Sequence, residues 1–281
     1  MPVACDAGRV FGALRAEHDE ITLGGGEPTL EPALLEVVAA ARLAGFVRVG
    51  LRSDARTLAR PGVAARLVAA GLTDVLVPLH GPNAACHDYH VGEAGRFAAT
   101  LGGLEAARSA GLAGAATTPL TRSNFRALGE LAALLGRHGL VAWQLTVAAG
   151  IEPTSELFVR LVPRLTLALP YALHALEQAR TLGLFAAVRG APLCRVGPYS
   201  ALTLPAMSRR YARACQACAA RKTCPGVDPG YLAAYGEHEL KALADAPPPG
   251  AALGDAARLL VEEDGCDELP AGPACAEPGL G

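Results

Sequence analysis

Short apolar runs alternate with longer amphipathic stretches rich in Ala, Leu and Arg between Glu20 and about Val188. The apolar runs predict strands at 20–23, 46–51, 74–79, 113–118, 141–146 and 184–188. The amphipathic stretches predict helices at 31–44, 60–70, 95–110, 123–137 and 155–182. Strands and helices that alternate at these lengths form a parallel sheet, because each crossover between parallel strands needs a helix. The sequence therefore predicts an α/β fold, either an open sheet or a barrel.

The loop after the first predicted strand carries three glycines, Gly24, Gly25 and Gly26, followed at once by Glu27 and Pro28. It has neither a G-x-G-x-x-G nor a Gly-Lys-Ser/Thr pattern, and a carboxylate beside the loop would repel a phosphate. Glycine carbonyls together with Glu27 can instead accept hydrogen bonds from an ammonium group. A tight strand-to-helix turn with an acidic first helical turn explains the same residues without a ligand. Both readings stay open on this evidence.

Three stretches in order resemble the radical S-adenosylmethionine (radical SAM) superfamily. The stretch EITLGGGEPTL, at 20–30, is similar to its GGEP motif. The stretch 77–112 is similar to the region after the fourth strand of peptide-modifying members, with matches at Gly81, His87, Asp88, Gly92, Gly95 and Phe97. The stretch 117–135 resembles their fifth strand and the helix after it. Three motifs in the same order are far more specific than one.

The resemblance implies a partial (β/α)6 barrel of the radical SAM type that binds SAM. The cofactor-binding residues that it implies are Gly24, Gly25, Gly26, Glu27, Pro28, Ser53 and Thr117. It further implies cleavage of SAM to a 5′-deoxyadenosyl radical, which abstracts hydrogen from a peptide or another natural product. Three positions depart from the peptide-modifying pattern: Pro78, His80 and Val91 stand where that pattern has Ser, Asp and Arg.

The superfamily's C-x3-C-x2-C motif, which holds its 4Fe–4S cluster, is not found before Gly24. Cys5 is followed four and seven residues later by Arg9 and Gly12. Without that cluster SAM cleavage lacks its electron source. We therefore expect residues 1–19 to be a residual first helix, with the first strand and cluster loop missing, and we expect the chain as written not to generate the radical. Two explanations are open: the gene model is truncated, or the chain is a natural, degenerate homologue that has kept the fold.

A second group of cysteines, Cys194, Cys215, Cys218 and Cys224, follows the predicted barrel. The C-x2-C-x5-C spacing brings three sulfurs within reach of one centre, and Cys194 offers a fourth. Four thiolates suit either a 4Fe–4S cluster or Zn²⁺, and four reduced structural thiols are the alternative. The basic residues nearby, Arg209, Arg210, Arg221 and Lys222, are expected to lower the thiol pKa values.

This segment is similar to the SPASM or twitch segments of radical SAM peptide-modifying enzymes, which hold auxiliary iron–sulfur clusters. Asp228 stands where the SPASM pattern continues with another cysteine. The resemblance therefore implies one auxiliary 4Fe–4S cluster, with Zn²⁺ as the alternative metal. The stretch 230–240 is expected to form a short helix that packs Tyr231 and Tyr235 over the site.

Three histidines, His80, His87 and His90, lie near Cys86 in the sequence. Their H-x6-H-x2-H spacing is not a typical zinc pattern, so a metal site is not predicted there. We interpret His87 and Asp88 as scaffolding within a loop.

Composition narrows the function classes. The chain has 281 residues, 51% hydrophobic and 19% charged, with a net charge of −2, so it is expected to be globular and to bind neither nucleic acid nor an anionic membrane. No apolar run approaches the ~18 residues of a membrane helix. The first residues do not read as a secretion signal, which predicts a cytoplasmic protein whose eight cysteines stay reduced and suit metal chemistry.

The predicted domains are the partial barrel at 20–190, a cysteine-rich segment at 191–245 and a flexible tail at 246–281, which holds one short helix at 254–263. Two functions follow. The first is a radical SAM enzyme that modifies a peptide or small molecule, with a redox donor or partner enzyme. The second is a non-catalytic homologue that binds a substrate peptide or partner enzyme, with the cysteines as a structural metal site.

Overall fold

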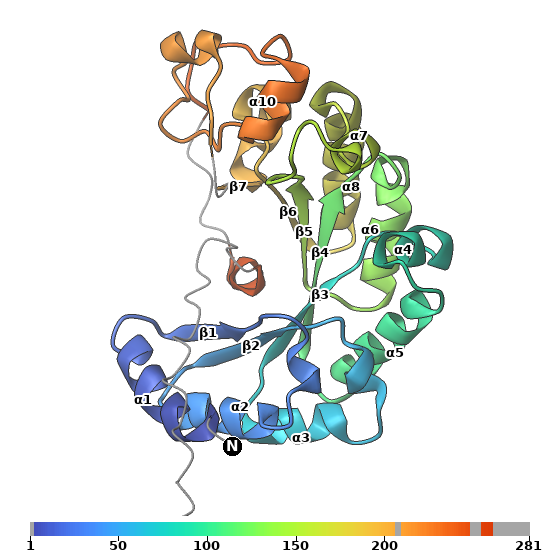
Figure 1. The fold of residues 1–281 in the computed structure, drawn as a ribbon, viewed down its shortest axis with the longest axis vertical. Helices are drawn as coiled ribbons and strands as arrows, with labels where there is room; N and C mark the ends of the chain where they lie inside the picture. The colour runs from blue at the N-terminus through green and yellow to red at the C-terminus, as the bar shows by residue number, and fades with distance from the viewer. Residues whose placement is uncertain (1–2, 206–208, 248–253, 261–281) are drawn as a thin grey trace, which may run out of the picture. The chain divides into compact units, whose positions relative to one another are not determined.

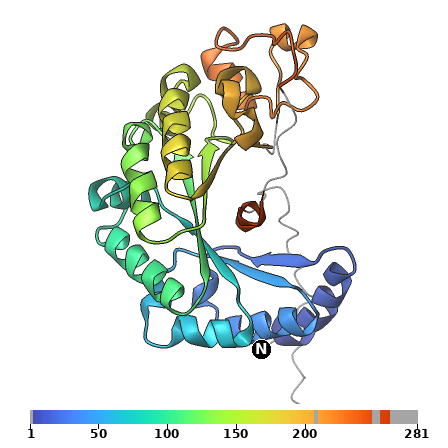
Figure 2. The same ribbon diagram turned by 180° about the vertical axis from the view of Figure 1, so that it is seen from behind.

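The computed structural model describes residues 3–205, 209–247 and 254–260, which fall into two compact units. The first unit contains residues 3–76 and 100–113, and the second contains residues 77–99 and the described residues from 114 to 260. Seven strands follow one another in chain order from β1 to β7 (Figures 1 and 2). Neighbouring strands within each unit are parallel. The predicted α/β partial barrel is confirmed, with one strand more than expected.

The first unit is a parallel sheet covered by helices. Its strands are β1 (Glu20–Leu23), β2 (Arg48–Arg52) and β3 (Asp74–Pro78), the last of which ends in the second unit. Its helices are α1 (Val3–Arg15), α2 (Leu34–Leu43), α3 (Val63–Ala70) and most of α5 (Arg96–Ser109), with short 3-10 helices at Pro28–Leu30 and Arg56–Ala59. Val49, Gly50 and Leu51 of β2 are all buried, as expected for a parallel strand covered on both faces.

One buried ion pair joins two strands of this unit. Asp74, at the start of β3, is 2% exposed. Its carboxylate accepts two hydrogen bonds from Arg48 of β2, with Nε–Oδ1 at 2.8 Å and Nη2–Oδ2 at 2.6 Å. A bidentate pair of this kind satisfies both charges away from water.

The second unit continues with β4 (Ala113–Leu120), β5 (Ala142–Val147), β6 (Phe185–Arg189) and β7 (Thr203–Leu204). Its helices are α4 (Ala84–Val91), α6 (Leu128–Arg137), α7 (Glu156–Leu161), α8 (Leu165–Thr181), α9 (Leu193–Val196) and α10 (Pro229–Tyr235). Short 3-10 helices lie at Phe125–Ala127, Gly197–Leu202, Arg213–Ala217 and Asp255–Leu259. The strand β7 was not predicted, because two residues carry no readable periodicity.

The two faces of β4, β5 and β6 differ in chemistry. On one face Trp143 of β5 is fully buried and its Nε1 donates to Thr118 Oγ1 of β4 at 3.0 Å. Figures 1 and 2 show α6 and α8 on one side of these strands. The opposite face carries Thr117, Gln144, Thr146 and Arg189, which the strand register places next to one another. We call these four residues the polar row.

The helix predicted at 155–182 is two helices, α7 and α8, which is a correction. Pro163 lies between them and has no N–H to donate, and the residue before a proline is disfavoured in the α-helical conformation. Helix α7 has its own N-cap, Ser155, whose Oγ accepts from the Phe158 N–H at 3.1 Å. The apolar pattern alone did not reveal this break.

The loop expected around His87 and Asp88 is the helix α4, which is a second correction. Asn83 caps it by accepting from the Cys86 N–H at 3.0 Å. The Asp88 carboxylate accepts from the N–H groups of Gly95 and Phe97, each at 2.7 Å, and so anchors the chain that follows. Asp88 does act as scaffolding, but from a helix.

The predicted helix at 254–263 is a 3-10 helix at Asp255–Leu259 over the part described. Residues 1–2, 206–208, 248–253 and 261–281 lie outside the described residues, and with them most of the predicted tail, including Cys266 and Cys275. Cys5 lies in α1, and its side chain is also outside the description.

Candidate functional site

The glycine–glutamate loop lies in the first unit, directly after β1. Gly25 and Gly26 have φ angles of 91° and 55°, in the left-handed region that favours glycine. A Cβ atom built on either glycine meets nothing within 4 Å, and both residues are exposed. The backbone of the loop is therefore open to direct approach by a ligand.

The Glu27 carboxylate is already engaged by the protein. Its Oε1 accepts from the Thr29 N–H at 3.0 Å, from Thr29 Oγ1 at 2.5 Å and from Ser53 Oγ at 2.7 Å. Its Oε2 accepts from the Asp54 N–H at 2.7 Å. Four donors thus hold this side chain, and Glu27 ties the loop after β1 to the loop after β2. Oε2, with one donor, keeps a further lone pair.

Hydrogen bonds and close packing within the loop after β2 fix Ser53 for its contact with Glu27. Ser53 is 3% exposed, and its Oγ also accepts from the Ala55 N–H at 3.0 Å. Ala55 is fully buried with a φ of 64°, a strained conformation for a residue with a Cβ. A Cβ on Gly103 of α5 would lie 1.9 Å from the Ala55 carbonyl oxygen, so only glycine allows this approach. The Gly102–Gly103 pair inside a helix was a readable signal that sequence reasoning missed.

Of the other predicted cofactor-binding residues, Pro28 is buried beside Glu27, and Thr117 belongs to the second unit. Thr117 is 7% exposed and belongs to the polar row. The structure thus brings Gly24 to Pro28 and Ser53 together within the first unit. Chemically, this group can accept hydrogen bonds from a cation through backbone carbonyls and Glu27 Oε2.

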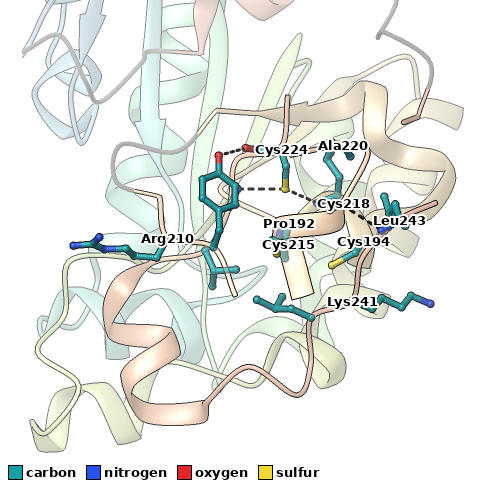
Figure 3. Close-up of a pocket in the computed structure, with 14 residues that line it drawn as sticks. Pro192, Cys194, Arg210, Cys215, Cys218, Ala220, Cys224, Lys241 and Leu243 are labelled. Carbon is teal, nitrogen blue, oxygen red and sulfur yellow. Dashed lines mark hydrogen bonds between the residues drawn. The ribbon is translucent and has the colours of Figure 1, made fainter. Parts of the chain in front are cut away.

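The four predicted cysteines line one cavity in the second unit (Figure 3). Cys224 is 9% exposed, and its Sγ accepts from the N–H groups of Leu193 and Gly226, each at 3.4 Å. Cys218 Sγ accepts from the Leu243 N–H at 3.3 Å. Backbone N–H donors directed at sulfur are one of the means by which proteins tune thiolate-bound clusters.

Electrostatics around this cavity differ from the expectation. Burial raises the pKa of the Cys224 and Cys215 thiols, so the basic residues nearby do not lower them. Arg210 lines the cavity, but Figure 3 shows its guanidinium directed away from the sulfur atoms. Arg221 instead lies over the Tyr211 ring, 5.3 Å from its centroid. Within the described ranges, no three His, Cys, Asp or Glu side chains are arranged to hold a single metal ion.

Asp228 anchors the cysteine-rich segment to the sheet. Its Oδ2 accepts from the Gly150 N–H at 3.1 Å, in the loop after β5. Its Oδ1 accepts from the Tyr231 N–H at 3.1 Å and so caps α10, the short helix predicted here. The residue that replaces a cysteine of the SPASM pattern is therefore an N-cap.

Tyr231 and Glu239 form a second, buried anchor. The Tyr231 hydroxyl donates to Glu239 Oε2 at 2.5 Å and accepts from the Leu165 N–H of α8 at 2.7 Å. Burial, and then the hydrogen bond to Glu239, raise the pKa of Tyr231. Burial would raise the pKa of Glu239, but hydrogen bonds from Tyr231, Thr166 and Arg164 lower it. The segment that carries the cysteines is thus fixed to the start of α8.

The three histidines after β3 form a compact cluster in the second unit. The His80 ring lies 5.4 Å from the ring centroids of both His87 and His90. Burial, followed by the neighbouring His87 and His90, lowers the pKa of His80 to about 4. His90 Nε2 lies 2.8 Å from Ser123 Oγ. Burial also lowers the pKa of His87 and of His90.

Comparisons with known proteins give the following matches. Residues 7–135 match the family model described as the radical SAM superfamily. An AdoMet-dependent heme synthase of Nitratidesulfovibrio vulgaris is 32% identical over 125 residues, which cover 44% of this chain and 34% of that protein. The mycofactocin maturase MftC of Mycobacterium ulcerans is 39% identical over 124 residues, covering 42% of this chain and 32% of that protein.

Among solved structures, Streptococcus suis SuiB bound to the precursor peptide SuiA superposes with a TM-score of 0.54 at 15% identity, over 67% of this chain and 42% of that one. This likeness concerns the fold alone. The chain spans about a third of the length of the curated relatives that it matches. Among the helices described, none combines the length and apolarity needed to cross a membrane. Residues 7–135 are therefore similar to the radical SAM superfamily, and just over 40% of the chain is similar to an AdoMet-dependent heme synthase and to the maturase MftC.

Proposed function

We propose that this chain binds SAM at the glycine–glutamate loop and carries an auxiliary iron–sulfur cluster, as part of a radical SAM protein that acts on a peptide. The observation that carries the proposal is the fixed geometry of Glu27, which is bound by Ser53 and Asp54 and so holds an exposed glycine backbone in place. SAM, when bound and cleaved, supplies the hydrogen-abstracting chemistry of the superfamily.

The residues of the loop fit the amino group of SAM. The space beside Gly25 and Gly26 is open, because a Cβ built on either residue has no other atom within 4 Å. Glu27 contributes negative charge beside that backbone, and its Oε2 can accept one more hydrogen bond. The glycine carbonyls and Glu27 would orient the ammonium group, because these acceptors are already in place and need no rearrangement.

The cysteine cavity fits a cluster held by thiolates. Cys194, Cys215, Cys218 and Cys224 line it together, and Cys224 receives two N–H donors. We propose that these four cysteines hold one 4Fe–4S cluster. When bound, the cluster supplies electron transfer; the protein supplies the thiolates, the N–H donors and the anchors at Asp228 and Tyr231.

The peptide class of substrate is proposed from the relatives. SuiB binds the precursor peptide SuiA, and MftC is named a maturase. The barrel strands of this chain follow the same fold as SuiB, which makes a peptide the first substrate to test.

The cluster is tested by anaerobic reconstitution with iron and sulfide. The wild-type chain is expected to hold about four irons, and the double variant Cys215→Ser/Cys218→Ser is expected to lose them. Cys86→Ser is the matched control, because Cys86 is a free, half-buried thiol outside the cavity. Tightly bound zinc in place of iron would replace this proposal by the structural metal site of a non-catalytic homologue.

SAM binding is tested by equilibrium dialysis with radiolabelled SAM. The wild-type chain is expected to bind, and Gly25→Val is expected not to, since Val is strained at a φ of 91° and fills the open space. Absence of binding to the wild-type chain, with the cluster present, would overturn the SAM proposal. Release of 5′-deoxyadenosine above background with SAM and dithionite would show that this chain generates the radical.

A further inference from the structure

Residues 254–260, which we call the tail segment, contact β5 in the second unit. The segment contains the 3-10 helix Asp255–Leu259 and then Leu260. Leu259 is 8% exposed and Leu260 5% exposed, whereas Asp255 and Arg258 are exposed and form an ion pair with each other. The segment thus places two leucines against the protein and its charges outward.

The tail segment lies on the face of the strands that the helices do not cover. Figures 1 and 2, seen from opposite sides, both show this short helix on the side of β4, β5 and β6 away from α6 and α8. A face covered by helices needs apolar side chains, and Trp143, Leu145 and Val147 of β5 supply them on the face opposite the polar row, which assigns the tail segment to the face of the polar row. Its contact with β5 therefore falls where Gln144 and Thr146 project.

The polar row keeps unused hydrogen-bonding capacity. Gln144 is 2% exposed, its Nε2 donates to Thr146 Oγ1 at 3.1 Å, and its Oε1 is buried with no partner among the described residues. A buried carbonyl without a donor is costly, and native proteins rarely keep one without a reason. An amide N–H from a peptide would satisfy it, and nothing in the tail segment does so.

We propose that the tail segment is a built-in inhibitor, which occupies the open face of β5 and must leave before a peptide can pair with Gln144. Burial of Leu259 and Leu260 favours docking of the tail segment, and the conformational entropy lost on ordering the segment opposes it. The net docking free energy is therefore small, so a ligand can displace the segment. The identity of that ligand as a peptide rests on the proposed function. The occlusion itself does not depend on SAM or on the cluster.

Hydrogen–deuterium exchange of the full chain tests the docking. In Leu259→Asp/Leu260→Asp, the amides of the tail segment are expected to exchange at least about tenfold faster than in the wild type, since each buried leucine contributes at least that factor. Leu259→Ala/Leu260→Ala serves as a milder second variant. The matched control is Leu157→Asp/Val159→Asp on α7, where both side chains are already 53% and 62% exposed. Equal exchange in the wild type and both tail variants would overturn the proposal.

Thiol labelling tests the occlusion. Thr146→Cys places a reporter in the polar row, and peptide mass spectrometry separates it from the eight native cysteines. Maleimide labelling of Cys at 146 is expected to be slow, and at least about tenfold faster when the Leu259→Asp/Leu260→Asp change is added. The α7 control is expected to leave the rate unchanged. Labelling that is equally fast in both backgrounds would show that the segment does not cover the row. A failure of SAM binding would change neither readout.

Discussion

Glu27→Gln tests whether this carboxylate is a scaffold or a direct ligand contact. The amide keeps one oxygen, which can still accept from Thr29 and Ser53. Its NH₂ group then faces the Asp54 N–H, which in the wild type donates to Glu27 Oε2 at 2.7 Å. Two donors face each other, and one charge-assisted hydrogen bond is lost.

The size of the effect follows from that lost bond. A hydrogen bond to a charged group contributes about 1.5–3 kcal/mol to stability. The site is only partly buried, so water relieves some of the penalty on the free N–H, and we expect a loss of about 2 kcal/mol in the free energy of unfolding. For a chain of 281 residues that corresponds to a fall of about 3–4 °C in Tm.

Urea unfolding followed by far-UV circular dichroism measures the loss, and hydrogen exchange at 24–29 and 53–55 localises it. Glu31→Gln is the matched control, because Glu31 is an exposed carboxylate nearby and its change should stay within about 0.5 kcal/mol. If Glu27→Gln unfolds at the wild-type midpoint, the carboxylate does not tie the two loops. A loss of SAM affinity with unchanged stability would make Glu27 a ligand contact instead.

Three further changes are expected to have measurable effects. Burial lowers the pKa of His80 from its ordinary value of 6.5 to about 4, so the unfolded chain binds that proton more tightly and stability falls as the pH drops from about 6.5 to about 4. His80→Gln should therefore remove about 2 kcal/mol of the difference in unfolding free energy between about pH 7.5 and about pH 5. Equal pH dependence of the unfolding free energy in the wild type and the variant would contradict this. Tyr231→Phe should cost about 2–4 kcal/mol in urea unfolding, because it removes the buried donor to Glu239; an unchanged midpoint would show that this anchor contributes nothing. Asp74→Asn should lower the free energy of unfolding by about 3–5 kcal/mol, measured by thermal melting, since Arg48 is left with a half-satisfied buried charge. A change under about 1 kcal/mol would show that the pair contributes no more than a solvent-exposed ion pair.

The sequence by itself determined the parallel α/β class and where each long element lies. Apolar runs and helical spacing are local properties, so β1, β4, β5 and β6 fall within about two residues of their predicted positions. The glycine–glutamate loop was readable for the same reason, since consecutive glycines before an acidic residue mark an unusual turn. The cysteine spacing likewise identified the cavity lining before the fold was known.

The sequence pattern did not predict the short elements or the breaks between helices. Helix α4 mixes polar and small residues, with His87 its one fully buried member, so no apolar stripe distinguishes it from a loop. The break between α7 and α8 lies at Pro163, yet Pro170 sits inside α8 without ending it. A proline's effect thus depends on the packing around it, which periodicity does not contain.

Only the tertiary structure decided which partners each functional side chain has. Glu27 meets Ser53 and Asp54 because β1 and β2 are parallel neighbours whose carboxyl ends lie together, although 26 and 27 residues separate them in the chain. Burial raises the pKa of Cys224, although basic residues lie near it in the sequence. The contact of the tail segment with β5 likewise has no trace in the local pattern. Such pairings arise from chain closure over long distances, and residue type alone does not specify them.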